Sequence, residues 1–512
     1  MLVKTFGSAV YGVNAICITV EVDISTGTFY SIVGLPDIAV KESYQRIESA
    51  LKNIGLRMPR QRIVVNMAPA DIRKEGSAYD LTIAVGILAA SGQVASEDVG
   101  NYIIMGELSL DGKLQPIRGA LPIAIQARTE GFKGFILPKQ NAREAAIVND
   151  LEVYGVENLT ELVEFLNGGK NIEQEKVDTR EEFARSQAAF EADFSDVKGQ
   201  ENIKRALEIA ASGGHNLILI GPPGAGKTML AKRLPGILPP LSLHEALETT
   251  KIHSVAGKLS TADALISIRP FRSPHHTISD VALVGGGGNP QPGEISLAHN
   301  GVLFLDELPE FKRSVLEVMR QPLEERKVTI SRARISVEYP ATFMLVASMN
   351  PCPCGFYNHP EKDCVCGPGI VQRYLSKISG PLLDRIDIHV EVTPVSFSEL
   401  SNKAPAEKSE LVRQRVVRAR DIQLERFKNR KETYCNAQMT PKLVREICQI
   451  EESGQQLLKT AMERLGLSAR AYDRILRVAR TIADLEGTQE IANEHLAEAI
   501  QYRSLDRQGW AG

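Results

Sequence analysis

The stretch Leu217-Ile-Leu-Ile-Gly-Pro-Pro-Gly-Ala-Gly-Lys-Thr228 decides the fold of this 512-residue chain. Its four leading apolar residues predict a short buried strand, and the periodicity from Met229 to Leu234 predicts a helix directly after the loop. Between them, Gly221–Thr228 matches the pattern G-x-x-x-x-G-K-[ST] in the strand–loop–helix context that a phosphate-binding loop requires. This arrangement predicts a parallel α/β domain that binds a nucleotide.

The predicted loop carries the groups that a nucleoside triphosphate needs. Its glycines let backbone N–H groups turn towards phosphate oxygens, and the start of the following helix adds a partial positive charge. We expect Lys227 to reach the β- and γ-phosphates of ATP and Thr228 to ligate Mg²⁺. The alternative is a chance match with a purely structural loop. The residues expected to contact the nucleotide are Gly221, Pro222, Pro223, Gly224, Ala225, Gly226, Lys227, Thr228 and Met229.

A second apolar strand, Gly301–Leu305, ends in two carboxylates, Asp306 and Glu307. Ligands of parallel sheets lie outside the carboxyl ends of the strands, so Asp306 is expected beside the Mg²⁺ that Thr228 holds. Glu307 is then placed to polarise the attacking water. Without the phosphate-binding loop, a solvated acidic turn would explain these carboxylates equally well.

Three more polar side chains stand at places where they could contact phosphate. Asn350 follows the expected strand Thr342–Ser348, Arg385 precedes another expected strand, and Arg470 opens a C-terminal helix. Asn350 could hold the water or the γ-phosphate, and the planar guanidinium of arginine matches phosphate oxygens. The alternatives are a turn-capping asparagine and two surface ion pairs.

Several motifs outside the loop are specific enough to indicate a family. Together with the loop, they resemble the magnesium-chelatase-like group of AAA+ ATPases, and within it the bacterial ComM/YifB-type proteins, over nearly the whole chain. The resemblance implies that Asn350 is sensor 1, that Arg470 is sensor 2, and that Arg385 is an arginine finger acting on the neighbouring subunit's nucleotide. It therefore implies a homo-hexameric ring. The motifs are Asp196–Gln200, Phe271–Thr277, Pro292–His299, Met349–Gly355 and Leu467–Tyr472.

The expected organisation is an α/β protein of three domains and a linker. Short strands at Ala15–Val22 and Gln61–Met67 alternate with helices at Glu42–Ile54 and Ala120–Arg128 in the first domain. The four regions are an N-terminal α+β domain (1–167), a polar linker (168–193), a P-loop AAA+ α/β core (194–394) and a C-terminal helical lid (395–512).

The N-terminal domain contains two segments that are similar to Lon-type proteases. Gly106–Gly119 is similar to the segment before their catalytic lysine, and Lys74–Ala78 to the stretch around their serine. The lysine position holds Ala120 or Leu121, however, and Ser77 is out of register with the nucleophile. The resemblance implies a Lon-like fold (ribosomal S5 domain 2-type) without the peptidase dyad, and without peptidase activity, because an unactivated serine is a weak nucleophile. The alternative is a rearranged dyad that uses Lys113 or Lys133.

Four of the seven cysteines form a C-x-C…C-x-C cluster. Four thiolates fit a closed tetrahedral Zn²⁺ site, which would be structural because it leaves no position open for water. His359 could replace one cysteine, and a redox pair or four unligated thiols remain as alternatives. The expected zinc ligands are Cys352, Cys354, Cys364 and Cys366.

The charge of the chain restricts how it could bind DNA. The net charge of −3, from 60 Lys and Arg against 63 Asp and Glu, excludes a uniformly basic coat. A local candidate is the expected hairpin Val328–Ile335, on which Arg332 and Arg334 share one face. Six copies of each would form a positive collar for a phosphate backbone. The alternative is a solvated hairpin, and the basic stretch Leu411–Lys431 is better explained as one face of a lid helix.

The sequence also indicates in which cellular compartment the protein is expected. Seven cysteines are too few for a secreted disulfide scaffold. The apolar stretch Ala15–Val20 meets Glu21 and Asp23, so it does not predict a signal peptide. The longest apolar run, Leu81–Ala90, is shorter than the roughly 20 residues of a membrane span. We therefore expect a cytoplasmic protein with no membrane partner.

These features predict a ring-forming ATPase that uses ATP and Mg²⁺ to remodel single-stranded or branched DNA. The resemblance implies helicase or branch-migration activity in homologous recombination of incoming DNA during natural transformation, with recombination proteins as partners. One alternative is a protein-remodelling motor of the magnesium-chelatase type. Another is an ATP-dependent peptidase, which the missing lysine disfavours.

Overall fold

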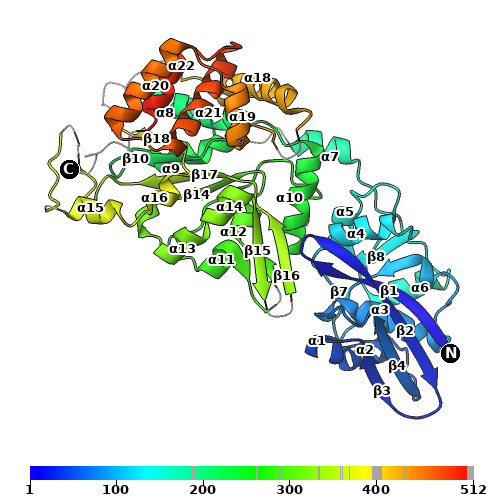
Figure 1. Ribbon diagram of the computed structural model, residues 1–512. Helices are drawn as coiled ribbons and strands as arrows, with labels where there is room; N and C mark the ends of the chain where they lie inside the picture. The colour runs from blue at the N-terminus through cyan, green and yellow to red at the C-terminus, as the bar shows by residue number, and fades with distance from the viewer. Residues whose placement is uncertain are drawn as a thin grey trace. The chain divides into compact units, whose positions relative to one another are not determined.

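The computed structural model describes residues 1–186, 192–260, 263–288, 290–332, 335–357, 359, 361–367, 369–394, 406–430 and 433–503. Its contacts divide the chain into two compact units (Figure 1). The first unit is built from three stretches, Met1–Gln187, Leu243–Ser267 and Ser331–Tyr339. The second unit contains Ala188–Ser242, Ile268–Ile330 and Pro340–Gly512.

A mixed sheet forms the centre of the first unit. In its described residues the strand order is β3-β4-β2-β1-β5-β8-β9, with β2 antiparallel to both β1 and β4 and the other neighbours parallel. The strands are β1 (Leu2–Tyr11), β2 (Asn14–Ser25), β3 (Tyr30–Val33), β4 (Arg62–Ala68), β5 (Tyr102–Ile104), β8 (Gly134–Pro138) and β9 (Glu152–Val156), with the small pair β6 (Glu107–Leu108) and β7 (Leu114–Gln115). Alternating burial along β2 and β4 confirms the two strands predicted in this region.

Helices α3, α4, α5 and α6 of the first unit pack on this sheet. Every residue of α3 is buried, so the longest apolar run of the chain is a core helix. None of the described helices is both long enough and apolar enough to cross a membrane. The helices are α1 (Ile38–Lys41), α2 (Ser43–Asn53), α3 (Asp80–Ala90), α4 (Ala120–Thr129), α5 (Lys139–Ala145), α6 (Leu159–Leu166) and α7 (Thr179–Ser186).

Two later segments of the sequence fold with this first unit. Helix α10 (Leu243–Val255) packs against α4, and the Gly119 N–H donates a hydrogen bond of 3.1 Å to the Ser254 carbonyl. The Tyr11 hydroxyl donates to the Ser336 carbonyl at 2.7 Å. The first unit is therefore assembled from segments that are far apart in the chain.

The second unit contains the predicted parallel sheet, with strand order β11-β14-β17-β10-β18 among the described residues. All neighbours are parallel, and nearly all residues of β10, β14, β17 and β18 are buried, as expected for a sheet covered on both faces. The strands are β10 (Leu217–Ile220), β11 (Phe271–Arg272), β14 (Val302–Leu305), β17 (Met344–Met349) and β18 (Ile388–Glu391).

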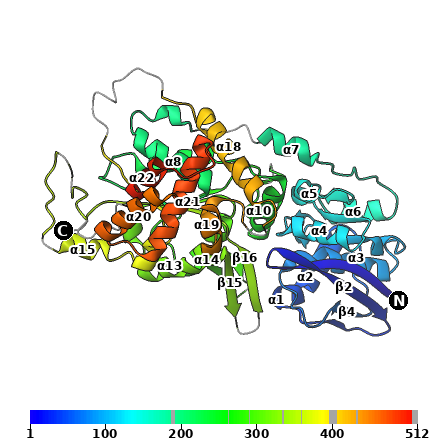
Figure 2. The same cartoon turned by 45° about the horizontal axis from the view of Figure 1, so that its top comes forward.

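The remaining elements of the second unit surround this sheet, and α18–α22 lie together as the orange and red ribbons of Figures 1 and 2. Those five helices form the predicted helical C-terminal region. The elements are α8 (Glu201–Gly213), α9 (Lys227–Arg233), α11 (Asp280–Val284), β12 (Gly285–Gly286), β13 (Gln291–Pro292), α12 (Glu294–Leu297), α13 (Arg313–Val318), α14 (Arg320–Glu325), β15 (Lys327–Arg332), α15 (Ile370–Leu375), α16 (Gly380–Leu383), α18 (Ser409–Phe427), α19 (Pro441–Ile447), α20 (Glu452–Leu465), α21 (Ala469–Glu486) and α22 (Asn493–Gln501). Strand β16 (Ile335–Pro340) and the end of β15 fall in the stretch that belongs to the first unit.

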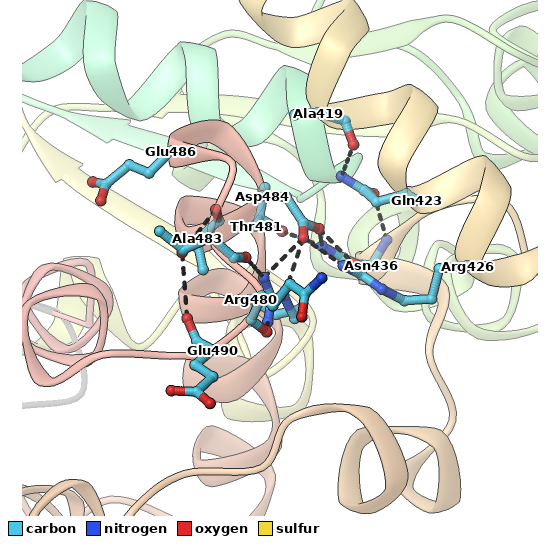
Figure 3. Close-up of polar contacts among 12 residues, drawn as sticks. Ala419, Gln423, Arg426, Asn436, Arg480, Thr481, Ala483, Asp484, Glu486 and Glu490 are labelled. Carbon is cyan, nitrogen blue, oxygen red and sulfur yellow. Dashed lines mark hydrogen bonds and ion pairs between the residues drawn. The ribbon is translucent and has the colours of Figure 1, made fainter.

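A buried carboxylate joins three segments of this helical region (Figure 3). Asp484 of α21 is fully buried and accepts two hydrogen bonds from Arg426 of α18, at 2.8 and 2.5 Å. It also accepts from Arg480 Nε at 3.1 Å and from Asn436 Nδ2 at 2.8 Å. Because both guanidinium groups and the carboxylate are hydrogen-bonded, the buried charges compensate one another.

Other arginines of the basic stretch also serve the fold. Arg415 of α18 forms ion pairs with Glu208 of α8 and with Glu407. Arg420 donates to the carbonyls of Ser212 and Ala211 at 3.1 and 2.9 Å. These contacts support the interpretation of this stretch as one face of a lid helix.

Removal of the buried carboxylate should destabilise the second unit. We expect Asp484→Ala to cost about 3–5 kcal/mol, because it leaves the buried guanidinium of Arg480 and the partly buried guanidinium of Arg426 without their counter-charge. The matched control is Glu446→Ala, which breaks an exposed ion pair with Arg430 and should cost less than about 1 kcal/mol. Thermal unfolding followed by circular dichroism measures both, and equal melting temperatures for the two variants would contradict the assignment.

Candidate nucleotide and metal sites

The phosphate-binding loop connects β10 to α9, as the sequence predicts. Gly224 and Gly226 have φ values of 79° and 82°, which glycine adopts without strain. The Lys227 ammonium donates to the carbonyls of Gly221 and Pro222 at 2.7 and 2.9 Å and to Asn350 Oδ1 at 3.1 Å. The predicted sensor asparagine therefore contacts the predicted phosphate-binding lysine, and Met229 lies one turn into α9.

The surroundings of Lys227 shift the pKa of its ammonium group. Burial lowers the pKa of Lys227, and the carboxylates of Asp306 and Glu307 oppose that shift. An anionic phosphate beside the ammonium would further favour its charged form. The site thus stabilises the lysine charge best when a polyphosphate is present.

Oxygen ligands suitable for Mg²⁺ gather at the carboxyl end of β14. Thr228 Oγ1 donates to Asp306 Oδ2 at 2.8 Å, and the Ser348 hydroxyl donates to the other carboxylate oxygen. The register of β14 against β17 brings Asp306 and Ser348 together. A threonine hydroxyl and a carboxylate are hard oxygen ligands of the kind that Mg²⁺ prefers, so the residues fit the predicted cation. Sequence reasoning missed Ser348, which only the strand register reveals.

Glu307 lies in a left-handed backbone conformation, with φ 55°, directly after Asp306. This conformation is uncommon for a residue with a side chain and often occurs at functional sites. Its carboxylate is 57% exposed and lies 3.6 Å from Nδ1 of His276. His276 belongs to the Phe271–Thr277 motif, but the sequence did not indicate this contact.

The two predicted phosphate-contacting arginines lie elsewhere on the second unit. Arg385 forms an ion pair with Glu324 of α14, and Arg470 Nη1 lies 3.4 Å from Asp384 Oδ2. The structure therefore groups Lys227 with Asn350, and Thr228 with Asp306 and its neighbour Glu307. It places Arg385 and Arg470 in contact with other residues, and Arg470 contacts Asp384, the residue that precedes Arg385 in the sequence.

The four clustered cysteines form a group that could hold a metal. Their sulfurs all lie within 4.8 Å of one another, with separations of 3.3, 3.5 and 3.7 Å among Cys352, Cys354 and Cys364. Sulfurs bound to one tetrahedral Zn²⁺ at about 2.3 Å would be about 3.8 Å apart, so the four thiols fit this metal. His359 is outside the group, and its Nδ1 accepts from the Glu361 and Lys362 N–H groups.

The cysteine loop packs directly against the phosphate-binding loop. A Cβ on Gly355 would lie 2.5 Å from Pro223 Cδ, so only glycine allows this approach, and its φ of 85° also favours glycine. Cys352 is buried and is separated from Asn350 by a single proline. The conformation of the cysteine loop therefore affects the position of Asn350.

The remaining predicted site residues lie on two other elements. Arg332 is exposed at the end of β15, whereas Arg334 lies outside the described residues. In the first unit, Ala120 and Leu121, at the position where the sequence comparison with Lon-type proteases predicts that the lysine is missing, are buried. Ser77 Oγ donates to Glu107 at 2.5 Å instead. The absence of a serine–lysine dyad stays a prediction.

Comparisons with known proteins agree with this geometry. Family models match residues 193–400 (magnesium chelatase, subunit ChlI), 20–141 (subunit ChlI of Mg-chelatase) and 406–503 (magnesium chelatase, subunit ChlI C-terminal). The chain is 44% identical to Competence protein ComM of Haemophilus influenzae over 99% of this chain and 98% of that protein. It is 45% identical to YifB of Escherichia coli over 98% and 96% of the two chains. Lon protease 2 of Bacillus subtilis is 35% identical over 28% of this chain and 27% of its own length.

The fold, the phosphate-binding loop and these matches define a magnesium-chelatase-type AAA ATPase. Its N-terminal domain is ChlI-like and Lon-like, its central domain is a parallel α/β sheet domain, and its C-terminal region is helical. The chain belongs to the magnesium chelatase ChlI-like family, in which it is a full-length homologue of ComM and YifB.

The position of Lys227 gives a direct test of the nucleotide site. Lys227→Ala should weaken binding of Mg-ATP at least about 10-fold, because one hydrogen bond to a charged group contributes about 1.5–3 kcal/mol. Lys232→Ala is the matched control, since this lysine is exposed on the same helix. Isothermal titration calorimetry measures both affinities. An unchanged affinity of Lys227→Ala for Mg-ATP would show that Lys227 does not bind the nucleotide.

Proposed function

We propose that this protein is a ring-forming ATPase that couples ATP hydrolysis to remodelling of single-stranded or branched DNA in the cytoplasm. The observation that carries the proposal is the 44% identity to a competence protein along 99% of the chain, combined with the assembled phosphate-binding site. Branch migration or helicase activity during homologous recombination of incoming DNA, in natural transformation, is the specific activity we infer. Recombination proteins are the expected partners.

Each site residue has a role in this mechanism. The loop from Gly221 to Thr228 holds the phosphates of ATP, with Lys227 on the β- and γ-phosphates. Thr228 and Asp306 would hold Mg²⁺, which would offset charge on the phosphates. Glu307 polarises the attacking water, and Asn350 keeps Lys227 oriented through their 3.1 Å contact.

Hydrolysis in this scheme depends on assembly. Arg385 acts on the nucleotide of the neighbouring protomer, and Arg470 contributes as sensor 2. Arginine fingers supplied by a partner raise hydrolysis by about 10³–10⁵-fold in the GTPase comparison. These roles require a ring in which each protomer completes the next site, and we infer that the ring is a homo-hexamer.

Contact with DNA is assigned to the β15–β16 hairpin. Arg332 is exposed on β15, and in a ring its six copies, with those of Arg334, would form a cationic collar. The resulting contacts are with the phosphate backbone, so binding should be insensitive to sequence and should weaken with salt.

A second candidate function is that of a protein-remodelling motor. The family models at residues 193–400 and 406–503 are both named for magnesium chelatase subunit ChlI, which favours this alternative. Both functions include ATP hydrolysis. They differ in whether DNA or a protein partner stimulates that hydrolysis.

Forked or four-way DNA should therefore increase ATP turnover at modest salt, while unfolded protein should not. Arg332→Ala should reduce this stimulation and flatten its salt dependence, because one phosphate contact per protomer is lost. Arg313→Ala, at an exposed arginine of α13, is the control and should behave as the unmodified protein. Stimulation by a protein partner but by no DNA form would favour the second candidate.

We also propose that the four clustered cysteines hold a structural Zn²⁺. The support is the closeness of the four sulfurs and their position in a loop that packs on the phosphate-binding loop. A bound ion would order this short loop, and through it the backbone that leads to Asn350.

Metal analysis tests this site. Protein purified with reductant and without chelator should contain about one zinc per chain, and Cys364→Ser should lower that content. Cys17→Ser, at a cysteine outside the cluster, should retain the full content. A content below about 0.2 zinc per chain in the unmodified protein would contradict the proposal.

A further inference from the structure

The side chain of Arg385 is held by a single acidic residue. Its guanidinium forms an ion pair with Glu324 of α14 and donates to the Pro381 carbonyl. The Nε–H group is buried without an acceptor among the described residues. The guanidinium borders a cavity of about 530 Å³ that is also lined by Glu317, Arg320, Glu324 and Glu325. There is thus open space beside a side chain whose hydrogen-bonding capacity is only partly used.

The backbone around Arg385, in contrast, is firmly anchored. The Arg385 carbonyl accepts from Asn216 Nδ2 at 2.8 Å, and the Asp387 N–H donates to the Asn216 carbonyl at 3.0 Å. The buried Arg503 donates to the Ile386 carbonyl at 2.6 Å. Asp387, also buried, hydrogen-bonds to His215. Movement of Arg385 is therefore restricted to its side chain.

The lid helix α21 adds two ion pairs to this anchor. Arg470 and Arg474, one helical turn apart, pair with Asp384 at 3.4 Å and with Asp387 at 3.0 Å. These pairs bracket Arg385 on either side in the sequence. The segment that carries Arg385 is thereby fixed to the lid on one side and to the sheet on the other.

The ion pair between Glu324 and Arg385 is the most exposed contact of the Arg385 side chain among the described residues. The Glu324 side chain is 60% exposed, whereas that of Arg385 is 11% exposed. Ion pairs with an exposed partner contribute little to stability, because water and salt screen them. A γ-phosphate carries more charge and accepts two parallel hydrogen bonds from a guanidinium, so it would compete successfully for the same group.

We propose that Glu324 is a positioning residue that holds the Arg385 side chain until the neighbouring protomer presents a γ-phosphate, and then releases it. The inference rests on the proposed role of Arg385 as a finger acting on the neighbour's nucleotide. Glu324 lies two residues before Arg326, whose left-handed backbone (φ 55°) leads into β15. Release of Arg385 therefore changes the contacts at the base of the strand that carries Arg332.

Mixed rings separate this role from a general structural one. The experiment mixes two variants. The Arg385→Ala protomer is the acceptor, because its own site keeps Glu307. The Glu307→Gln protomer is the donor, because it keeps Arg385, so ATP is hydrolysed only where a donor completes the site of an acceptor. Adding Glu324→Gln to the Glu307→Gln donor should raise ATP turnover about 2–5-fold at limiting ATP, as expected for loss of one exposed ion pair. The same change in the Arg385→Ala acceptor should have no effect.

Each outcome has a definite meaning. If the mixture without Glu324→Gln shows no restored turnover, Arg385 does not act in trans and the proposed function itself fails. If turnover is restored but the donor-side change leaves it unaltered or lowers it, the role of Glu324 is overturned while that of Arg385 stands. An equal effect from the acceptor side would also overturn it. Glu325→Gln in the donor is the matched control, because Glu325 is the exposed neighbour of Glu324 on α14 and should leave the rate unchanged.

Discussion

The parallel register of β10, β14 and β17 is the constraint on which the site depends. Backbone hydrogen bonds align Ile220 with Met349 and Leu305 with Ala347, so the three strands end at one edge of the sheet. The loop that carries Lys227 and Thr228 follows the end of β10, Asp306 and Glu307 follow β14, and Asn350 follows β17. A shift of one residue in any of the three strands would turn the alternating side chains to the opposite face and separate the groups that must meet.

The nucleotide site and the cysteine loop share the same piece of backbone. Asn350 contacts Lys227, and the loop that follows returns to pack Gly355 against Pro223. The order of the cysteine loop is thereby linked to the geometry of the phosphate-binding loop. The buried charge cluster around Asp484 has a comparable role in the helical region, where it fixes α18 relative to α21.

Local sequence patterns were sufficient to predict the parallel sheet, the strand–loop–helix context of the phosphate-binding loop and the closeness of Asp306 to Thr228, because each depends on a strand, its end and a known packing rule. The contacts of Lys227 with phosphate stay a prediction. They could not reveal Ser348 beside Asp306, which depends on the pairing of two strands. Nor could they reveal the ion pair between Arg385 and Glu324, which are 61 residues apart and belong to no common pattern. Long-range register and side-chain direction, rather than propensity, decide such contacts.

The first unit is built from three separate stretches of the chain, which affects how the protein responds to proteolysis. Because the first unit includes residues 243–267 and 331–339 as well as the N-terminal stretch, the polypeptide passes between the two units five times. Cleavage in the polar stretch near residue 187 would break only one of these connections. A nicked molecule would stay in one piece under native conditions, and its two fragments would separate only after unfolding.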